Sequence, residues 1–598
     1  MKQENCKTRT TLPWTGGWLV FALASLLFGG EQSGLLPLSP PTAQDLPSAA
    51  GIVTMERFIV EATRSDPRQW TYLEAPGFEI LSRVGSAMTI QAARSFFNEI
   101  ELERQFVPAA YWSPPATPST YIIFDNEPLS LETSRLRPDP SRISDTEKIT
   151  LDGGLYVFDQ DTHCAVQNMW GLEWLEGVDY AGAHSGGGAT GSAFLIGRAL
   201  PAPPLWYQCG VVGLISAPHS RGETSLRLLP YAMTWARAQW ITRMQTDRMV
   251  SEALKTKSLP VLPPIKTLFE PVDSAHSQPP PKWLAEAGEE KSIPSDDWLA
   301  ESILFVRWGV FDKEPGIDEE VKDGIGHSRA FAAFLSRSCH ERVTEGLFRE
   351  CFGFGYEEMQ RKLSRYLVDQ SVGPITVGYP KISMWPPPHP PFSTRTPTNS
   401  EIARIIGDWE RIEAASKKNT DPDLSRLYLK QAGKTLQQGF EGGARDPALL
   451  AALGLYDFDI GSRDNARAML TIATEAAVPR PLAYIELAQI AYEDADRHPA
   501  GAGKKFSPQQ TAAVLKPIFQ CRRISQLDAS AYRLVALAWK RSDTKPTPAQ
   551  LAILKTVPSL FPFDSELNAL VKEVFAQWGY GTESAGNIFF GPIRRSAN

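Results

Sequence analysis

Cys209 is the residue of this sequence with the clearest capacity for covalent chemistry. A thiolate becomes an effective nucleophile when a neighbouring imidazole takes its proton, and His163 or His219 could supply that base if the fold brought either one close. Nothing in the sequence places these residues together. A thiol within the apolar run CGVVGLI is more often an inert, packed side chain, so we favour that interpretation over a nucleophile-base pair.

The histidines do not form a pattern for a metal site. A zinc site of the common helical type needs two imidazoles one turn apart and a carboxylate. No His-x-x-x-His pair occurs among the eight histidines, which are His163, His184, His219, His276, His327, His340, His389 and His498. No glutamate lies between Glu176 and Glu223. We therefore expect neither a metal nor another cofactor.

The elements expected to position these residues begin with short strands. Residues 70–75 and 78–84 predict two strands separated by a Pro-Gly turn. Apolar residues recurring every three or four positions between 90 and 100 predict a helix. Further strand signals follow at 120–124 and 154–158. This order is typical of an α+β domain.

Helical patterns follow, and a proline-rich run then interrupts them. The patterns fall at residues 298–310, 328–338, 342–352 and 356–368. The run WPPPHPPF at 385–392 stops regular structure because proline supplies no amide donor. We interpret it as a stiff connector strapped across a domain junction, and a polyproline ligand for another protein is the alternative.

From residue 401 onward the pattern is helical and it repeats. The same pattern, two large residues three positions apart with a small residue after the second, occurs three times. Its copies are Leu450, Leu453 and Gly454; Tyr484, Leu487 and Ala488; and Tyr532, Val535 and Ala536. The first two copies are 34 residues apart, which is the tetratricopeptide period, and an insertion near 494–506 lengthens the next interval to 48. The pattern predicts an α-solenoid of three or more stacked repeats.

Several stretches between residues 78 and 367 carry a resemblance to a known family. They are FEILSRV before a long helix, TYIIFD as an edge strand, PPLWYQCGVVGLIS at 203–216, WLAESILFVRWGVF at 298–311 and LFRECFGFGYEEMQRKLSRYL at 347–367. This segment resembles the gluzincin-type, peptidase MA-like domains that precede tetratricopeptide repeats in bacterial envelope proteins. The resemblance implies a zincin-like α+β domain whose later helices form a subdomain over the cleft.

The zinc ligands of that family are missing here. In the family, a Pro-x-Trp segment leads into Glu-Gly-x-Ala, whose Glu is the third ligand, and an HExxH helix lies upstream. Trp206 matches the family's Trp and Gly210 its Gly, but Cys209 stands at the position of the ligand Glu. No catalytic or metal-binding residue carries over. Trp206, Cys209 and Gly210 remain candidates for lining a remnant cleft.

The N-terminus has the layout of a secretory signal peptide or a short anchor. Lys2, Lys7 and Arg9 precede an apolar run at 18–28, which is too short for a stable membrane span. Residues 31–51 are rich in Pro, Ser and Gly, as in a flexible tether. We expect an exported protein, periplasmic or associated with the cell envelope. It would contact a membrane only through an uncleaved N-terminal segment, if at all.

These features predict an α+β N-terminal domain, zincin-like with a helical subdomain, followed by an all-α, tetratricopeptide-like solenoid. The predicted parts are a signal peptide or short anchor at 1–30, a tether at 31–55, a degenerate peptidase-like domain at 56–378, a Pro-rich linker at 379–400 and the helical repeats at 401–598.

Composition bears on partners and on disulfides. The net charge of -7 is small for 598 residues and no segment concentrates Lys and Arg, so nucleic acid is not an expected partner. Six scattered cysteines are too few for a disulfide scaffold. Cys339 and Cys351 could pair if the protein is exported, and buried free thiols are the alternative.

The sequence therefore predicts a pseudo-metallopeptidase, a non-catalytic protein that binds a protein or peptide partner. The concave face of the helical repeats is the first expected binding surface, because stacked repeats present an extended groove. The remnant cleft around Trp206 is the second. The alternative function is a hydrolase that uses residues outside the family's set, for example Cys209 with a nearby histidine.

Overall fold

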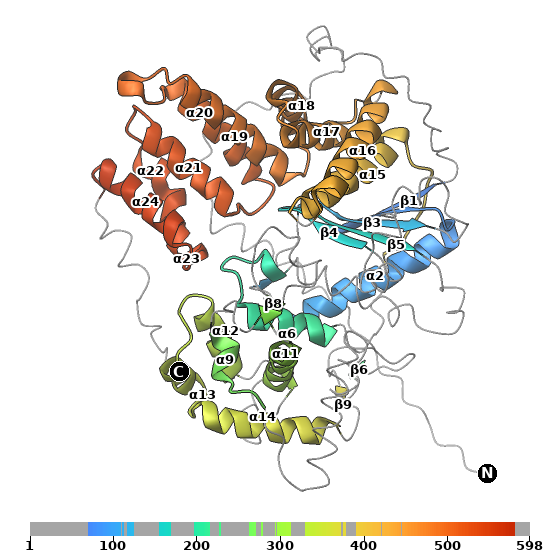
Figure 1. The fold of residues 1–598 in the computed structure, drawn as a ribbon, viewed down its shortest axis with the longest axis vertical. Coiled ribbons are helices and arrows are strands. Elements are labelled where there is room, and N and C mark those ends of the chain that lie inside the picture. The colour runs from blue at the N-terminus through green and yellow to red at the C-terminus, as the bar shows by residue number, and fades with distance from the viewer. Residues whose placement is uncertain are drawn as a thin grey trace, which may run out of the picture. The chain divides into compact units, whose positions relative to one another are not determined.

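Figure 1 shows the fold in a computed structural model, in which helices dominate and one small sheet lies near the start of the described chain. The predicted leader, the tether and His219 lie outside the described residues. These residues are 70–108, 111–112, 116–124, 155–168, 196–215, 226–228, 262–270, 277–278, 293–294, 296–311, 329–371, 375–377, 390–419, 421–443 and 445–580.

The chain enters the sheet as an antiparallel hairpin. β1 (Thr71–Ala75) pairs with β2 (Phe78–Ser82) along its whole length. The turn between them contains Gly77 at φ +87°, a conformation that L side chains rarely adopt. The strands predicted at 70–75 and 78–84 are confirmed.

β3 (Ser119–Phe124) lies at the centre of the sheet, whose strand order is β1-β2-β3-β5-β4. β3 pairs in parallel with β2 and with β5 (His163–Asn168), and β4 (Leu155–Phe158) is antiparallel to β5 at the edge. The expectation that TYIIF forms an edge strand is therefore wrong. Ile122 and Ile123 point to opposite faces and both are fully buried, which is typical of an interior strand.

Helices cover both faces of the sheet (Figure 1). α2 (Ser86–Phe106) packs on one face, where the ring of Phe96 stacks on Tyr121 with 3.8 Å between centroids. α15 (Asn399–Lys417) packs on the other face, and its Trp409 is 1% exposed within a core shared with the strands. One hydrophobic core thus joins the sheet to the first helix of the C-terminal region.

The segment that precedes α15 lies along β1. The backbone of Arg395 exchanges two hydrogen bonds with Tyr72, at 2.8 and 2.9 Å, and its guanidinium lies 4.4 Å from the centre of the Tyr72 ring. Phe392 packs into the core between the sheet and α2. These are the contacts that a connector strapped across the sheet would make. The first five residues of the proline-rich run, 385–389, lie outside the described residues.

Helices from the middle of the chain enclose an aromatic core. These helices are α6 (Leu205–Ile215), α9 (Lys266–Phe269), α11 (Asp296–Phe311), α12 (Arg329–Ser338), α13 (Glu345–Phe352) and α14 (Tyr356–Ser371). The helices predicted between residues 298 and 368 are confirmed as α11 to α14. Two short antiparallel ladders accompany them, β6 (Leu226–Leu228) with β9 (Ile375–Val377) and β7 (Ser277–Gln278) with β8 (Ile293–Pro294).

The C-terminal region is helical throughout its described residues, apart from short connections. Its elements after α15 are α16 (Pro422–Glu441), α17 (Pro447–Asp459), α18 (Arg463–Glu475), α19 (Pro481–Arg497), η9 (Ala502–Lys504), α20 (Pro508–Cys521), α21 (Ala529–Arg541), α22 (Pro548–Leu551), η10 (Ala552–Thr556), α23 (Val557–Leu560) and α24 (Ser565–Gln577). Proline at the first turn starts several of these helices, where its missing N–H costs no hydrogen bond.

These helices pack in pairs. α15 packs against α16, α17 against α18, α19 against α20 and α21 against α24, and the first members of successive pairs also contact one another. A Cβ atom on Gly454 would lie 2.8 Å from the Leu470 side chain, so glycine allows α17 and α18 to approach closely. Among the repeat positions predicted from the sequence, Leu450, Tyr484 and Tyr532 are buried.

Two further expectations concern membranes and disulfides. In the part of the chain that the structure describes, no helix is long and apolar enough to cross a bilayer. Cys339 and Cys351 are free thiols, so the disulfide alternative for this pair is not realised.

Candidate functional site

Trp206, the first residue expected at a remnant cleft, lies in the first turn of α6 and is 3% exposed. Its ring stacks on Phe334 with 5.7 Å between centroids and contacts Phe305 at 5.2 Å. Rings from α9 and α12 complete its surroundings. The aromatic core of the middle helices therefore accounts for this residue as packing.

Gly210 lies where α6 crosses α11. A Cβ atom at this position would lie 2.3 Å from Cγ2 of Val306 and 2.7 Å from the backbone oxygen of Ser302. Gly213, one turn later, is equally close to Ile303. Two glycines on one face of α6 thus permit close helix-helix packing, which explains Gly210 without a ligand.

Cys209 and His163 belong to different cores. Cys209 packs against the aromatic core of the middle helices, and burial raises its pKa to about 12, so its thiol stays protonated at neutral pH. His163 is fully buried on β5 with its ring edge toward Tyr121, and burial lowers its pKa to about 4. The structure therefore does not bring these two residues together. Within the described ranges, no group of three or more metal-binding side chains occurs.

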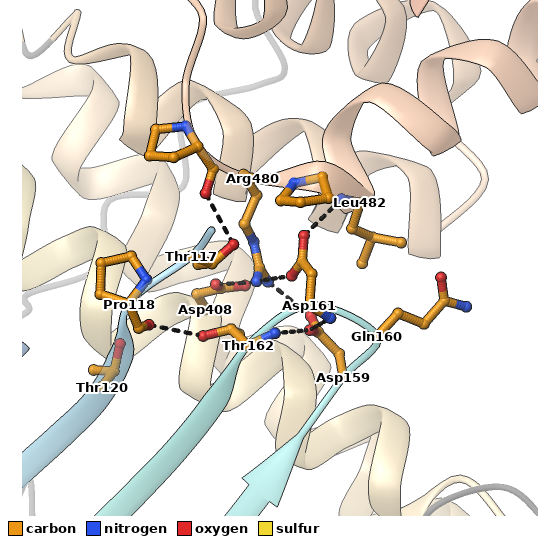
Figure 2. Close-up of polar contacts among 12 residues, drawn as sticks. Thr117, Pro118, Thr120, Asp159, Gln160, Asp161, Thr162, Asp408, Arg480 and Leu482 are labelled. Carbon is orange, nitrogen blue, oxygen red and sulfur yellow. Dashed lines mark hydrogen bonds and ion pairs between the residues drawn. The ribbon is translucent and has the colours of Figure 1, made fainter. Parts of the chain in front are cut away.

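A buried cluster of charged side chains lies where the β4–β5 turn meets the C-terminal helices (Figure 2). Oδ1 of Asp159 accepts the backbone N–H groups of Asp161 and Thr162, each at 3.0 Å, which closes the turn. Its Oδ2 lies 2.6 Å from Nη2 of Arg411 and 2.7 Å from Nη2 of Arg480. The local fold of the turn thus directs one carboxylate toward two guanidiniums.

Asp161 binds the N-terminus of α19, as Figure 2 shows. Its Oδ2 accepts the backbone N–H of Leu482 at 2.6 Å, and its Oδ1 pairs with Nη1 of Arg480. Pro481 occupies the first helical position, so Leu482 supplies the first free N–H of the helix. The partial positive charge at a helix N-terminus favours a carboxylate there.

α15 supplies the remaining members of the cluster. Arg411 donates to Oδ1 of Asp408 at 2.8 Å, and Arg480 lies 3.0 Å from Oδ2 of the same residue. These side chains are between 3% and 18% exposed. We define the junction cluster as Asp159, Asp161, Asp408, Arg411 and Arg480.

The junction cluster has three carboxylates and two guanidiniums. The pKa values of Asp159 and Asp161 are shifted in opposite directions. Burial raises the pKa of Asp161 to about 7, while the Arg480 guanidinium opposes that rise and the Asp159 carboxylate adds to it. Burial acts in the same direction on Asp159, but the Arg480 and Arg411 guanidiniums outweigh it and hold its pKa below the usual range. Of these two carboxylates, Asp161 is therefore the one that takes up a proton first as the pH falls.

Further polar contacts join the sheet to the C-terminal helices. Thr117, just before β3, donates its hydroxyl to the carbonyl of Pro479 at 2.9 Å. On β2, the buried Glu79 accepts two hydrogen bonds from Arg404 of α15, at 2.6 and 2.8 Å. Tyr72 donates to the same carboxylate at 3.0 Å. These polar groups hold the sheet against the C-terminal helices, because donors of the same chain bind each carboxylate.

Sequence reasoning missed the junction cluster because its members are far apart in the chain. The ion pair between Asp161 and Arg480 joins residues 319 positions apart. Two local signals were available: an Asp-x-Asp pair in a turn between strands, and an arginine and a proline immediately before a predicted helix. Neither signal indicates which distant residue its side chains contact.

A pocket of about 490 Å³ lies near this junction. Ala116, which precedes Thr117, forms part of its wall, and the connection between α20 and α21 forms most of the rest. Its other lining residues are Arg522, Ile524, Ser525, Gln526, Leu527 and Tyr532.

The described chain is thus a mostly helical protein with a small mixed sheet near its start and a helical C-terminal region. Comparison with known protein families, with curated proteins and with solved structures found no match in any of the three.

Proposed function

We propose that this protein is a non-catalytic scaffold that binds another protein or a peptide through its C-terminal helices. In this proposal, the paired helices α15 to α24 form a tetratricopeptide-like solenoid. The sheet and the middle helices form a degenerate peptidase-like domain retained for its shape. The protein acts after export, in the periplasm or at the cell envelope.

The helix packing is the observation that carries the proposal. In the described C-terminal region, α15 packs with α16, α17 with α18, α19 with α20 and α21 with α24, and the first members of these pairs contact in succession. Such an arrangement buries apolar surface between neighbours and leaves a row of helices along one side, which is how repeat proteins present an extended binding surface. The 34-residue spacing of the first two copies of the sequence motif agrees with it.

The junction cluster gives the sheet a role in this function. It fixes the β4–β5 turn against α15 and the start of α19, and α15 already buries its apolar face on the sheet. A partner would therefore meet the later helices, α19 to α21. The sheet would act as a rigid cap at the beginning of the repeats, since exposed terminal repeats need a cover.

Photo-cross-linking tests the proposed function. A photoreactive residue replacing Lys540, which is 43% exposed on α21, should form a discrete adduct in an envelope extract. The same residue replacing Arg361, 63% exposed on α14, is the matched control. The captured partner, once purified, should bind the whole chain saturably. Adducts from position 361 alone, or from neither position, would contradict the proposal.

Thiol labelling tests the absence of a cysteine nucleophile. With a pKa of about 12, Cys209 is a thiolate in only about one molecule in a hundred thousand at pH 7. Iodoacetamide should therefore leave Cys209 unmodified in the native protein at pH 7 and modify it in the denatured protein, as peptide mass mapping will show. Rapid stoichiometric labelling of native Cys209 would revive the hydrolase alternative.

A further inference from the structure

The pocket beside the junction has a polar rim and an apolar wall. Ala116, Ile524 and Leu527 supply apolar surface, while Arg522 and Tyr532 supply polar atoms. A second hollow, of about 460 Å³, is lined by Phe519, Arg522 and Arg523 in the described chain. Arg522 lines both hollows, so its guanidinium is available to a ligand in either of them.

Tyr532 is the unusual member of this lining. It is 6% exposed, and its ring packs edge-on against Phe561 with 5.4 Å between centroids. Tyr532 lines the pocket, and no described residue hydrogen-bonds to its hydroxyl. A phenolic hydroxyl open to the pocket can donate a hydrogen bond to a ligand oxygen there.

The charges of the site have one sign. Arg522 and Arg523 are exposed and form no ion pair within the described part of the chain. No aspartate or glutamate occurs among the described lining residues of either hollow. A guanidinium binds a carboxylate with two parallel hydrogen bonds, so this surface is complementary to a carboxylate.

We propose that these two hollows bind an acidic segment of the partner, with a Glu or Asp carboxylate held by Arg522 and the Tyr532 hydroxyl. The inference rests on the proposed function and specifies its ligand. The apolar lining favours a peptide over a compact anion, because Phe519, Ile524 and Leu527 offer contacts to the residues that flank the carboxylate.

Binding of defined peptide probes to the whole chain tests this inference. The probe is a fluorescent decapeptide of alternating Glu and Leu, and the matched probe has Gln in place of each Glu. Fluorescence anisotropy should show the Glu probe binding at least about tenfold more tightly, since a hydrogen bond to a charged group contributes about 1.5–3 kcal/mol. Equal binding of the two probes would overturn the proposal.

Variants locate the binding. Arg522→Glu should weaken binding of the Glu probe more than about tenfold, and Tyr532→Phe, which keeps the ring, should weaken it about threefold or more. Arg426→Glu changes an arginine on α16 that is 74% exposed and should bind as the original chain does. Unchanged binding by Arg522→Glu would overturn the inference, and circular dichroism will show that each variant is folded.

The two proposals fail separately. If cross-linking at position 540 succeeds while the probes bind without regard to charge, the repeats bind a partner but this pocket does not hold an acidic segment. If neither position gives an adduct, the proposed function fails, whatever the probes show.

Discussion

Arg480 takes part in more ion pairs within the junction cluster than any other member does. It contacts Asp159, Asp161 and Asp408, which come from the β4–β5 turn and from α15. The side chain is 6% exposed, so water cannot replace it readily. Its removal would leave the buried Asp161 without a counter-charge and would leave Asp159 and Asp408 to share Arg411, which is a costly arrangement in a protein interior.

Arg480→Met should therefore lower the free energy of unfolding by about 3–5 kcal/mol, the usual range when one partner of a buried ion pair is lost. Urea denaturation followed by circular dichroism measures this change. Arg426→Met, at an arginine that is 74% exposed, is the control and should change stability by less than about 0.5 kcal/mol. A loss below about 1 kcal/mol for Arg480→Met would show that the cluster does not stabilise the junction.

Asp161 gives the junction a pH dependence. Its pKa of about 7 in the folded protein exceeds the unfolded value of about 3.9, so between these values the folded state binds more protons than the unfolded state. The contribution of Asp161 to stability should fall as the pH rises from about 4 to 7 and then level off. The difference in unfolding free energy between the original protein and Asp161→Asn, measured by urea titration at several pH values, should follow this course.

The control for this titration is Asp159→Asn. Burial raises the pKa of Asp159 but the guanidiniums lower it further, so Asp159 stabilises the folded state above about pH 4 and loses that contribution below. The stability difference for Asp159→Asn should thus change only below about pH 4, whereas that for Asp161→Asn should change between about pH 4 and 7. Parallel curves would contradict the assignment of the higher pKa to Asp161.

Among the elements, α6 and α11 cross closely at two glycines of α6, Gly210 and Gly213. Gly210 lies so close to the Ser302 backbone that a side chain at position 210 would overlap with it. The residue thus has a structural role independent of any cleft. The same argument applies to Gly454 between α17 and α18, where the Leu470 side chain fills the space above the glycine.

Gly210→Ala should destabilise the protein by about 1–3 kcal/mol, because the added methyl group forces α6 away from the α11 backbone. Thermal unfolding will measure the loss. Gly346→Ala on α13 is the matched control: its Cβ would lie 3.7 Å from its nearest neighbour, and alanine favours a helix over glycine. The packing argument would be wrong if both variants had the same stability.

At the scale of the molecule, the sheet and the first C-terminal helix share one core. Trp409, Ile405 and Ile412 of α15 pack with strand residues such as Ile122, and the described residues all belong to the unit Ala62–Asn598. Separation of the chain at the predicted boundary before residue 401 would expose this apolar stripe to water. The helical region is thus not expected to be self-contained.

A fragment of residues 401–598 should bind the dye 1-anilinonaphthalene-8-sulfonate and self-associate, because the α15 face that packs on the sheet is uncovered. Size-exclusion chromatography and dye fluorescence measure both effects. The chain from residue 62 onward, which retains the sheet, is the control and should do neither. A monomeric fragment that binds no dye would contradict the shared core.

Elements with strong periodicity could be predicted from local sequence patterns. The hairpin strands, the four helices between residues 298 and 368 and the buried repeat positions such as Leu450 and Tyr484 follow from local patterns of apolar residues. These patterns succeed because burial of one face repeats with the period of the element. The central position of β3 in the sheet could not be predicted from local patterns, because strand order depends on which strands pair.

The junction cluster and the surroundings of the expected cleft residues could not be predicted from the sequence, because both depend on the tertiary packing. Asp161 meets Arg480 across 319 positions, and Cys209 and His163 lie in separate cores, because folding brings residues together by the packing of whole elements. The local sequence does not show whether a charged residue will be buried, because burial depends on a counter-charge that comes from a distant part of the chain. Only the packing of the folded chain brings the two charges together.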